Sequence, residues 1–97
     1  MKILAAIPCY NEGLAIGSVA LKASRYVDEV LVVDDGSTDD TAAIATAAGA
    51  TVVAHDKNAG KGRAVKNALR YAVEHDFDVL VLLDGDGRHV SEGRFRG

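Results

Sequence analysis

The amino-acid sequence predicts an α/β fold built on an open, mainly parallel sheet. Four short aliphatic runs recur along the 97 residues, at 3–7, 29–33, 51–54 and 78–83. These runs are nearly continuous rather than alternating, which is typical of strands covered on both faces. The segments between the runs have helical spacing, and this alternation requires parallel strands joined by right-handed crossovers. The expected order is therefore β-α-β-α-β-α-β.

The first two gaps between the strands each predict a helix. In the first gap, apolar residues recur every three or four positions: Ala15, Ile16, Val19, Ala20 and Ala23. The second gap, TDDTAAIATAAG, is rich in alanine and reaches Gly49, a suitable C-cap. Thr38 is the expected N-cap of this second helix, and Asp39 and Asp40 would interact favourably with its dipole.

The third gap predicts the most clearly amphipathic helix. Its polar side, with Arg63, Lys66, Asn67 and Arg70, faces away from one apolar stripe. The stripe consists of Ala64, Val65, Ala68, Leu69 and Ala72.

Composition narrows the class of protein. With 48% hydrophobic and 26% charged residues, the chain resembles one soluble globular domain that spans residues 1–97. A net charge of -3 argues against nucleic acid as a partner. The lone Cys9 fits a reducing compartment, and the five-residue apolar run before Pro8 is too short to span a membrane. A cytoplasmic location is expected.

The loops that follow the strands carry the candidate functional residues. Ligands of open parallel sheets bind at the carboxyl ends of the strands. The four loops at these ends read PCYNEG, DDGSTDD, HDKNAGKG and DGDGRH. They bring an aromatic side chain, several carboxylates and a glycine-rich loop to one edge of the sheet.

The last of these loops holds two aspartates that one glycine separates. Asp84 and Asp86 would point into the same crevice, and Gly85 would keep the turn tight and let a ligand approach. Two close carboxylates repel one another, and a cation about 4 Å away would offset this by roughly 4 kcal/mol per charge pair at an effective dielectric constant of about 20. Mg²⁺ or Mn²⁺ suits such oxygen ligands.

Two other strand ends suit a nucleotide. Asp35 ends a buried strand and could accept hydrogen bonds from a base or a ribose hydroxyl. The NAGKG loop, where Gly60 and Gly62 flank Lys61, offers backbone N–H groups and a cation to an anion. This loop is not a Walker motif, because His55 stands where the first glycine should be.

Four motifs in order resemble one enzyme family. PCYNE, VVDDGSTDDT, NAGKGRAVKNAL and DGDGRH, over residues 3–89, are similar to the N-terminal half of family 2 glycosyltransferases, especially polyprenol-phosphate glycosyl or mannosyl synthases. The resemblance implies a truncated, Rossmann-like GT-A fold that binds a UDP- or GDP-sugar with Mg²⁺ or Mn²⁺. It implies that the base and ribose contact Pro8, Tyr10, Glu12, Val33 and Asp35. It also implies that Asp84, Gly85 and Asp86 form the D-x-D motif, with Asp86 on the metal and the diphosphate.

Two departures from the family pattern limit this resemblance. Arg88 stands where relatives often have a glutamine that can help bind metal, and arginine cannot ligate a cation. The resemblance also implies that the acceptor-binding half and the catalytic base lie beyond residue 97. We therefore expect the isolated chain to bind a donor without transferring the sugar, and we expect a polyprenyl-phosphate acceptor in full-length relatives.

Two other classes share parts of the pattern. A receiver-like signalling domain would use an acidic pair such as Asp34 and Asp35, with Asp84 as its phosphoacceptor, but receivers begin with the acidic strand. A dinucleotide-binding fold would explain GKGRAV, but Val65 replaces the third glycine of that fingerprint.

The remaining polar and aromatic residues have ordinary structural interpretations. His55, His75 and His89 lack the spacing of metal ligands, so we expect them on the surface or in loops. Cys9 is expected to be a small filler beside the site. Tyr26 and Tyr71 are expected to be packing residues.

A homodimer is predicted from the expected strand order. In the related fold the sheet begins 3-2-1-4, which would leave residues 79–83 as an unprotected apolar edge. Such an edge has unpaired N–H and C=O groups and is a template for pairing with a second copy.

Overall fold

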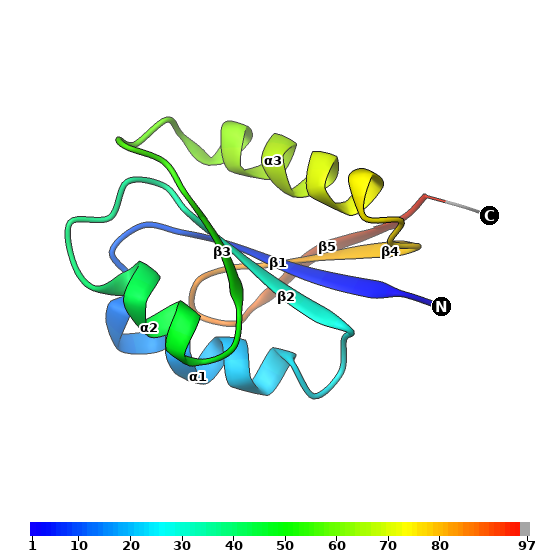
Figure 1. Cartoon of the computed structure of the whole chain (residues 1–97), viewed down its shortest axis with the longest axis horizontal. Helices are drawn as coiled ribbons and strands as arrows, with labels where there is room; N and C mark the ends of the chain where they lie inside the picture. Colours follow the sequence, from blue (N-terminus) through cyan, green and yellow to red (C-terminus); the bar gives the residue numbers. More distant parts are fainter. Residues whose placement is uncertain (96–97) are drawn as a thin grey trace.

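The computed structural model describes residues 1–95, with Lys61 described by its backbone alone. A five-stranded sheet lies between two helical layers: α3 covers one face, and α1 and α2 cover the other (Figure 1). The elements in chain order are β1 (Ile3–Cys9), α1 (Gly13–Ala23), β2 (Glu29–Asp34), α2 (Thr41–Ala47), β3 (Thr51–Ala54), α3 (Lys61–Glu74), β4 (Val79–Leu83) and β5 (His89–Arg94). The predicted α/β class and its first seven elements are confirmed.

The sheet has the order β3-β2-β1-β4-β5, which confirms the predicted 3-2-1-4 arrangement. β1 lies at the centre and pairs in parallel with β2 and with β4. β2 also pairs in parallel with β3. The crossover through α3 therefore connects β3, at one edge of the sheet, to β4 on the other side of β1. Helices α1 and α2 lie on the opposite face from α3 (Figure 1).

Alternate side chains of β1 enter two separate cores. Leu4 and Ala6 face α3, whereas Ala5, Ile7 and Cys9 face α1 and α2. Both sets are buried, so the strand is apolar at nearly every position. This two-sided burial is the physical reason for the continuous aliphatic runs in the sequence.

The core beneath α3 is built from small residues on the helix and larger ones on the sheet. Ala64, Ala68 and Ala72 are fully buried and lie against Leu31 and Leu80. Alanine lets the helix axis approach the sheet closely, while each buried leucine contributes about 1.5–3 kcal/mol of hydrophobic stabilisation. α3 is thereby held with its N-terminus at the carboxyl edge of the strands.

β5 is the one strand that the sequence analysis missed. It pairs antiparallel with β4, from Val79 opposite Arg94 to Leu83 opposite His89. The prediction that residues 79–83 form an exposed edge is therefore wrong, because β5 satisfies the N–H and C=O groups on that side of β4. A dimer through β4 is excluded by this pairing.

A tight turn joins β4 to β5. The N–H of Gly87 donates to the carbonyl of Asp84 at 2.8 Å, and the N–H of Asp84 donates to the carbonyl of Arg88 at 2.8 Å. Gly87 has a φ of 92°, a left-handed conformation that glycine adopts at little cost. A turn followed by such a residue is a common hairpin connection, and here it carries the Asp84–Asp86 pair.

Helix α2 begins three residues later than its predicted cap. It starts at Thr41, and the N–H of Thr38 instead donates to Oδ1 of Asn11 at 2.9 Å. Asp39 accepts from the N–H of Thr41 at 2.9 Å and from the N–H of Gly13 at 3.1 Å. The prediction for Thr38 was wrong, whereas the structural role of Asp39 is confirmed, because its carboxylate joins the N-termini of α1 and α2.

Four side chains outside the site were given expected roles, and the structure contradicts one of them. Tyr26 was expected to pack, but it is 80% exposed. Tyr71 does pack, against the core that includes Phe77, and its hydroxyl donates to Glu29. His75 and His89 are exposed as predicted. Within residues 1–95, no helix is both long enough and apolar enough to cross a membrane.

Candidate functional site

The candidate site lies where two neighbouring strands stop pairing. β1 pairs with β2 as far as Cys9 opposite Asp34, but it pairs with β4 only as far as Ala6 opposite Leu82. Beyond that point comes Pro8, whose missing N–H falls on the β4 side of the strand, because backbone groups alternate in direction. The chain continues in opposite directions along the sheet here, from β1 toward β2 and from β4 toward β5, and ligands of open α/β sheets bind at such a switch point.

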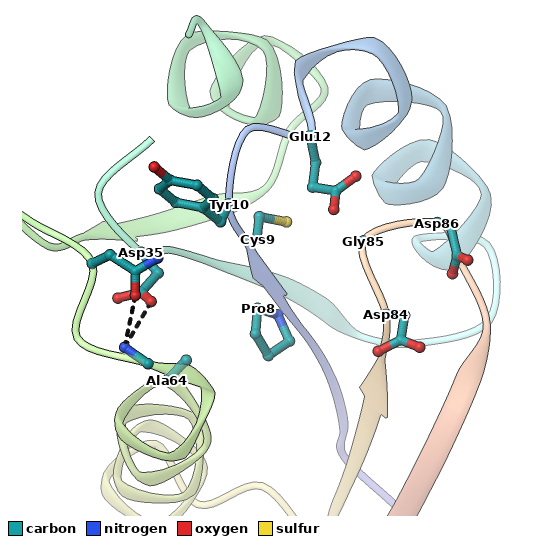
Figure 2. Close-up of a pocket in the computed structure, with 11 residues that line it drawn as sticks. Pro8, Cys9, Tyr10, Glu12, Asp35, Ala64, Asp84, Gly85 and Asp86 are labelled. Atoms are coloured by element: carbon teal, nitrogen blue, oxygen red, sulfur yellow. Dashed lines mark hydrogen bonds between the residues drawn. The ribbon is translucent and has the colours of Figure 1, made fainter. Parts of the chain in front are cut away.

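A cavity of about 390 Å³ opens at this point. Figure 2 shows Asp35 on one side of it and Asp84 on the other, with Pro8 between them. Seven of the predicted site residues line the cavity: Pro8, Tyr10, Glu12, Asp35, Asp84, Gly85 and Asp86. Asn58 and Gly60 from the loop before α3 line it as well, so four loops that are distant in sequence meet here, as expected from their places at the strand ends.

Asp35 is fixed on one side of the cavity by a set of hydrogen bonds. Its Oδ1 accepts from the N–H of Ala59 at 2.9 Å and lies 3.1 Å from Nδ1 of His55. Its Oδ2 accepts from the N–H of Gly60 at 3.0 Å. The side chain is 9% exposed. The carboxylate thus ties the end of β2 to the loop that precedes α3.

These hydrogen bonds also set the charge of Asp35. Burial raises the pKa of the carboxyl, but the amide of Ala59, the imidazole of His55 and the amide of Gly60 together outweigh burial and hold the pKa below its ordinary value. Hydrogen bonds donated to a carboxylate favour its ionised form. Asp35 is therefore a fixed anion with a known orientation.

Gly36 explains how the two loops approach so closely. A side-chain carbon at this position would lie 2.6 Å from the carbonyl carbon of Lys57 and 2.7 Å from the backbone nitrogen of Asn58. The residue also has a φ of 78°. Only glycine satisfies both conditions without strain. The glycine of the DDGS stretch thus lets the neighbouring loop reach Asp35.

The opposite side of the cavity is formed by the Asp84–Gly87 turn. A side-chain carbon on Gly85 would lie 2.7 Å from Cγ of Glu12 and 2.8 Å from its Cδ. Glu12 comes from the loop after β1, so its side chain packs directly over the backbone of the turn. The glycine between the two aspartates therefore makes room for Glu12, in addition to the predicted role of keeping the turn tight.

Asp86 is far more exposed than Asp35. Its Oδ1 accepts from the N–H of Arg88 at 3.1 Å, and its Oδ2 lies 3.3 Å from Nε of Arg88. The exposed fractions of the two side chains are 53% and 82%. The backbone N–H of Arg88 lowers the pKa of Asp86 and outweighs the small effect of desolvation, and the charge of Arg88 lowers it further. Asp86 is therefore ionised and open to solvent.

The charge around the cavity indicates what it can hold. Four acidic side chains line it, those of Glu12, Asp35, Asp84 and Asp86. Such a cavity repels an anion unless a cation is also present. Among the described residues no group of three or more His, Cys, Asp or Glu could hold a metal ion. Two carboxylates fit a hard cation such as Mg²⁺ or Mn²⁺, which completes its coordination with water and phosphate oxygens.

Cys9 also lines the cavity, but it is chemically inert there. Burial, followed by the charges of Glu12, Asp34 and Asp39, raises the pKa of the thiol to about 12. Its Sγ donates to the carbonyl of Ile7 at 3.4 Å. A protonated thiol is a poor nucleophile and a poor metal ligand. This matches the expectation of a small filler beside the site.

The structure separates one predicted residue from the others, does not describe the side chain of a second, and adds four. Val33 is fully buried in the core beneath α3 and does not line the cavity. The side chain of Lys61 lies outside the described part of the structure. Cys9, Asn58, Gly60 and Ala64 also line the cavity; of these, only Gly60 was named in advance, as part of an anion-binding loop, and Cys9 was expected beside the site as a filler. Asn58 and Gly60 belong to the glycine-rich loop, so their place beside Lys61 in that motif was the available signal.

His55 differs most from its expected place. It follows β3 in a loop, as predicted, but its side chain is only 6% exposed. It lies between Asp35 and Asn67, and both ring nitrogens have polar partners. The sequence shows no spacing that would reveal these contacts, which join residues from three different elements.

Comparison with known families identifies the chain. The family model described as "Glycosyl transferase family 2" matches residues 5–93. The chain belongs to glycosyl transferase family 2. The match confirms the resemblance inferred from the four strand-end motifs. It argues against the receiver-like and dinucleotide-binding interpretations. The sheet also differs from that of a receiver. Its last strand is antiparallel, and its strand order is not the 2-1-3-4-5 order of flavodoxin-like folds such as receivers.

Curated relatives of this glycosyl transferase family 2 chain are longer proteins. Glycosyltransferase AglJ of Haloferax volcanii is 42% identical over 86 residues, which cover 84% of this chain and 26% of the relative. Undecaprenyl-phosphate mannosyltransferase of Micrococcus luteus is 37% identical over 102 residues, which cover 95% of this chain and 41% of the relative. The chain therefore spans roughly a quarter to two-fifths of the length of these two proteins.

A solved structure of another protein has a similar fold. Glucosyl-3-phosphoglycerate synthase from Mycobacterium tuberculosis, in complex with Mn²⁺, UDP and glucosyl-3-phosphoglycerate, superposes with a TM-score of 0.71 at 35% identity. The match covers 87% of this chain and 33% of the synthase chain. Another structure of that synthase contains Mg²⁺ and UDP. These neighbours thus bind UDP together with a divalent cation.

Proposed function

We propose that this chain forms the donor site of a glycosyltransferase and binds a nucleotide-diphospho-sugar, UDP- or GDP-linked, together with Mg²⁺ or Mn²⁺. The observation that most strongly supports this is the cavity between β1 and β4, which has a fixed carboxylate on one side and an exposed acidic turn on the other. Binding of UDP with Mn²⁺ by the synthase from Mycobacterium tuberculosis supports the same ligand class.

The buried side of the cavity would hold the nucleoside. Asp35 keeps acceptor capacity on Oδ2, which takes one hydrogen bond, so it can accept one from an N–H of the base or from a ribose hydroxyl. Pro8 and Tyr10 offer apolar surface from the loop after β1. Tyr10 is exposed, and its ring can stack on a base. Glu12 would bind further along the cavity, near the ribose.

The acidic turn would hold the diphosphate end through a cation. Asp84 and Asp86 supply carboxylate oxygens from one turn, and Gly85 leaves the backbone close to the ligand. A bound divalent cation would supply positive charge against the leaving diphosphate. Lys61 and the backbone N–H groups near Gly60, at the start of α3, would bind phosphate oxygens as well.

The sugar acceptor and the transfer step are further parts of the proposal. A polyprenyl phosphate is the acceptor class that the named mannosyltransferase relative suggests. Direct displacement by a hydroxyl acceptor would also need a base, whereas the ionised oxygen of a polyprenyl phosphate can attack without one. Since the resemblance assigns the acceptor-binding half and the base to positions beyond residue 97, we expect these 97 residues alone to bind the donor without completing transfer. A homodimer remains part of the proposal, but not through β4, whose outer edge pairs with β5.

Calorimetry tests the donor site directly. The full chain would be titrated with UDP and with GDP, with and without Mn²⁺, and the Asp86→Ala variant would be titrated in parallel. We expect Mn²⁺ to strengthen binding of one of the two nucleotides, and Asp86→Ala to weaken binding with Mn²⁺ about tenfold or more, because the cation loses a carboxylate ligand. Glu74→Ala is a matched control that removes an exposed carboxylate from the far end of α3. Affinities that are unaffected by Mn²⁺ and by Asp86→Ala would contradict the proposal.

A further inference from the structure

Asp35 contacts His55, and His55 in turn contacts Asn67. Nδ1 of His55 lies 3.1 Å from Oδ1 of Asp35. On its other side, Nε2 of His55 contacts Nδ2 of Asn67. His55 and Asn67 are not among the residues that line the cavity, and the His55 side chain is buried. These two residues can affect a ligand only through Asp35.

The contacts define which nitrogen of His55 carries the proton. The amide nitrogen of Asn67 is a donor, so Nε2 of His55 must accept and cannot itself be protonated. In a neutral imidazole the proton is then on Nδ1. Nδ1 therefore donates to Oδ1 of Asp35. Asn67 selects the tautomer that lets His55 hold the carboxylate.

This donation leaves the two oxygens of Asp35 unequal. Oδ1 accepts from both His55 and Ala59, which fills the two acceptor positions of a carboxylate oxygen. Oδ2 accepts from Gly60 and retains one position. If His55 did not donate, the carboxylate could rotate about its χ2 angle, because terminal torsions of this kind are broad. The remaining acceptor would then lose its fixed direction.

We propose that His55 and Asn67 are positioning residues for the donor site: Asn67 holds His55 in the Nδ1-protonated tautomer, and His55 orients Asp35 so that Oδ2 presents one acceptor to an N–H or O–H of the nucleoside. The inference rests on the proposed function, because it assigns a ligand to Oδ2. It assigns no contact with the ligand to His55 or to Asn67.

Two isosteric substitutions separate the proposed role from packing. The side-chain amide of asparagine can occupy the place of the imidazole Nδ1, whereas that of glutamine reaches the place of Nε2. His55→Asn therefore keeps the donor to Asp35, and His55→Gln loses it. Glutamine is closer to histidine in size, so a role in packing alone would make His55→Gln the milder change. Positioning of Asp35 predicts the opposite order.

Binding of UDP in the presence of Mn²⁺ is the first measurement, by calorimetry on the full chain. We expect His55→Gln to weaken UDP binding about tenfold and His55→Asn by less than about threefold, since a hydrogen bond to a charged group is involved. Asn67→Leu, which removes the donor to Nε2, should weaken binding about threefold. His75→Gln, at the exposed end of α3, is the control and should bind like the wild type.

The second measurement needs no ligand. In ¹⁵N-detected NMR of the ligand-free wild type, we expect a protonated Nδ1 and an unprotonated Nε2 for His55, and we expect Asn67→Leu to populate both tautomers. Thermal unfolding of every variant distinguishes loss of binding from loss of the fold. If His55→Gln does not fold, Asn67→Leu and the NMR signals still decide the question.

The outcomes separate this inference from the proposed function. A wild type that binds neither UDP nor GDP would overturn the proposed function and, with it, the ligand assigned to Oδ2. Wild-type binding that is unchanged in His55→Gln, or weakened more by His55→Asn than by His55→Gln, would overturn only the inference. An unprotonated Nδ1 in the ligand-free protein would also overturn it, whatever the affinities.

Discussion

The two sides of the cavity are built in different ways. On one side Asp35 is 9% exposed and takes hydrogen bonds from a neighbouring loop that packs against Gly36. On the other side Asp86 is 53% exposed, and its hydrogen bonds come from Arg88 in the same turn. The first side is part of the folded framework, whereas the second can change its partners at little cost.

Because of this difference, the two sides suit different parts of a ligand. A buried carboxylate with fixed partners has one direction in which it can accept a further hydrogen bond, so it suits a ligand group of defined geometry. An exposed pair of carboxylates keeps its hydration until a cation replaces the water. Substitutions on the Asp35 side should therefore affect stability and binding together, and those on the Asp86 side should affect mainly binding.

Gly36→Ala should have the largest effect, on the Asp35 side. The new methyl group would meet the backbone of Lys57 and Asn58, and the residue would be held at a φ of 78°. We expect the free energy of unfolding to fall by about 3 kcal/mol or more, because neither backbone can move without breaking the bonds to Asp35. Urea denaturation followed by circular dichroism measures this change.

Gly49→Ala is the matched control for that prediction. Gly49 also has a positive φ, of 91°, but nothing lies within 4 Å of a side-chain carbon built there. Its substitution should cost only about 1 kcal/mol, from the backbone conformation alone. Equal losses in the two variants would show that the close approach at Gly36 has no energetic weight.

Asp35→Ala should have the next largest effect. It leaves the N–H of Ala59 without its acceptor and takes one of two acceptors from the N–H of Gly60, which also donates to Oδ1 of Asn58, so we expect a loss of about 2 kcal/mol in the free energy of unfolding at neutral pH. Asp86→Ala removes an exposed carboxylate and should change the same quantity by less than about 0.5 kcal/mol. Comparable losses would contradict the division between the two sides.

At acidic pH the wild type and Asp35→Ala should have similar free energies of unfolding. The pKa of Asp35 is lowered in the folded state, so its contribution to stability is complete above the ordinary pKa of an aspartic acid. That contribution is lost as the pH falls through the lower, folded-state pKa. Urea denaturation of both proteins at neutral and at acidic pH measures this. The difference between their free energies of unfolding should be smaller at acidic pH, and a difference that does not change with pH would argue against an ionised Asp35.

Gly85→Ala should have a smaller effect, on the Asp84–Asp86 side. The methyl group would displace Glu12, whose side chain can rotate away, so we expect a loss of about 1 kcal/mol in stability and weaker binding of UDP with Mn²⁺. Gly62→Ala, in the first turn of α3 with open space around it, should be neutral or stabilise the fold by about 0.5–1 kcal/mol. Denaturation and calorimetry measure both quantities.

Arg88→Gln should have the smallest effect on stability, below about 0.5 kcal/mol, because its pair with Asp86 is exposed. The substitution frees Asp86 from a competing cation. We therefore expect binding of UDP with Mn²⁺ to strengthen by about two- to threefold, most visibly at low ionic strength. Weaker binding would instead indicate that Arg88 itself holds the phosphates.

The order of the first four strands and the three described helices were predictable because they depend on local patterns. Continuous aliphatic runs, helical spacing and right-handed crossovers determine which strands pair in this part of the sheet. The approximate place of the site followed as well, since the loops at the carboxyl ends of parallel strands must meet. Pro8, Asp35 and the Asp84–Asp86 turn converge for this reason.

β5 was missed because an exposed edge strand has no apolar period. Its residues, HVSEGR, are all exposed. The dipeptide Asp-Gly occurs twice directly after β4, however, and such a pair between two extended segments is a strong hairpin signal. Giving that signal more weight would have replaced the expected free edge with a hairpin.

The contacts of His55 could not have been predicted in this way. They join a loop residue to Asp35, twenty positions earlier, and to Asn67 on α3. No spacing rule connects these three positions, because their distance depends on how closely α3 approaches the sheet. Likewise, the burial of Val33 follows from its place in the core beneath α3, a detail that the family resemblance did not supply.

The buried residues of the two cores come from sequence ranges of different length. The core beneath α1 and α2 draws its buried residues from positions 5–50, whereas the core beneath α3 draws them from positions 4–80. Closing longer loops costs more chain entropy, so the first core is expected to assemble earlier during folding. The cavity exists only once β4 has joined β1, and it is therefore among the last features to form. A folding intermediate made of β1, β2, β3 and their two helices would carry Asp35 but would still lack the cavity.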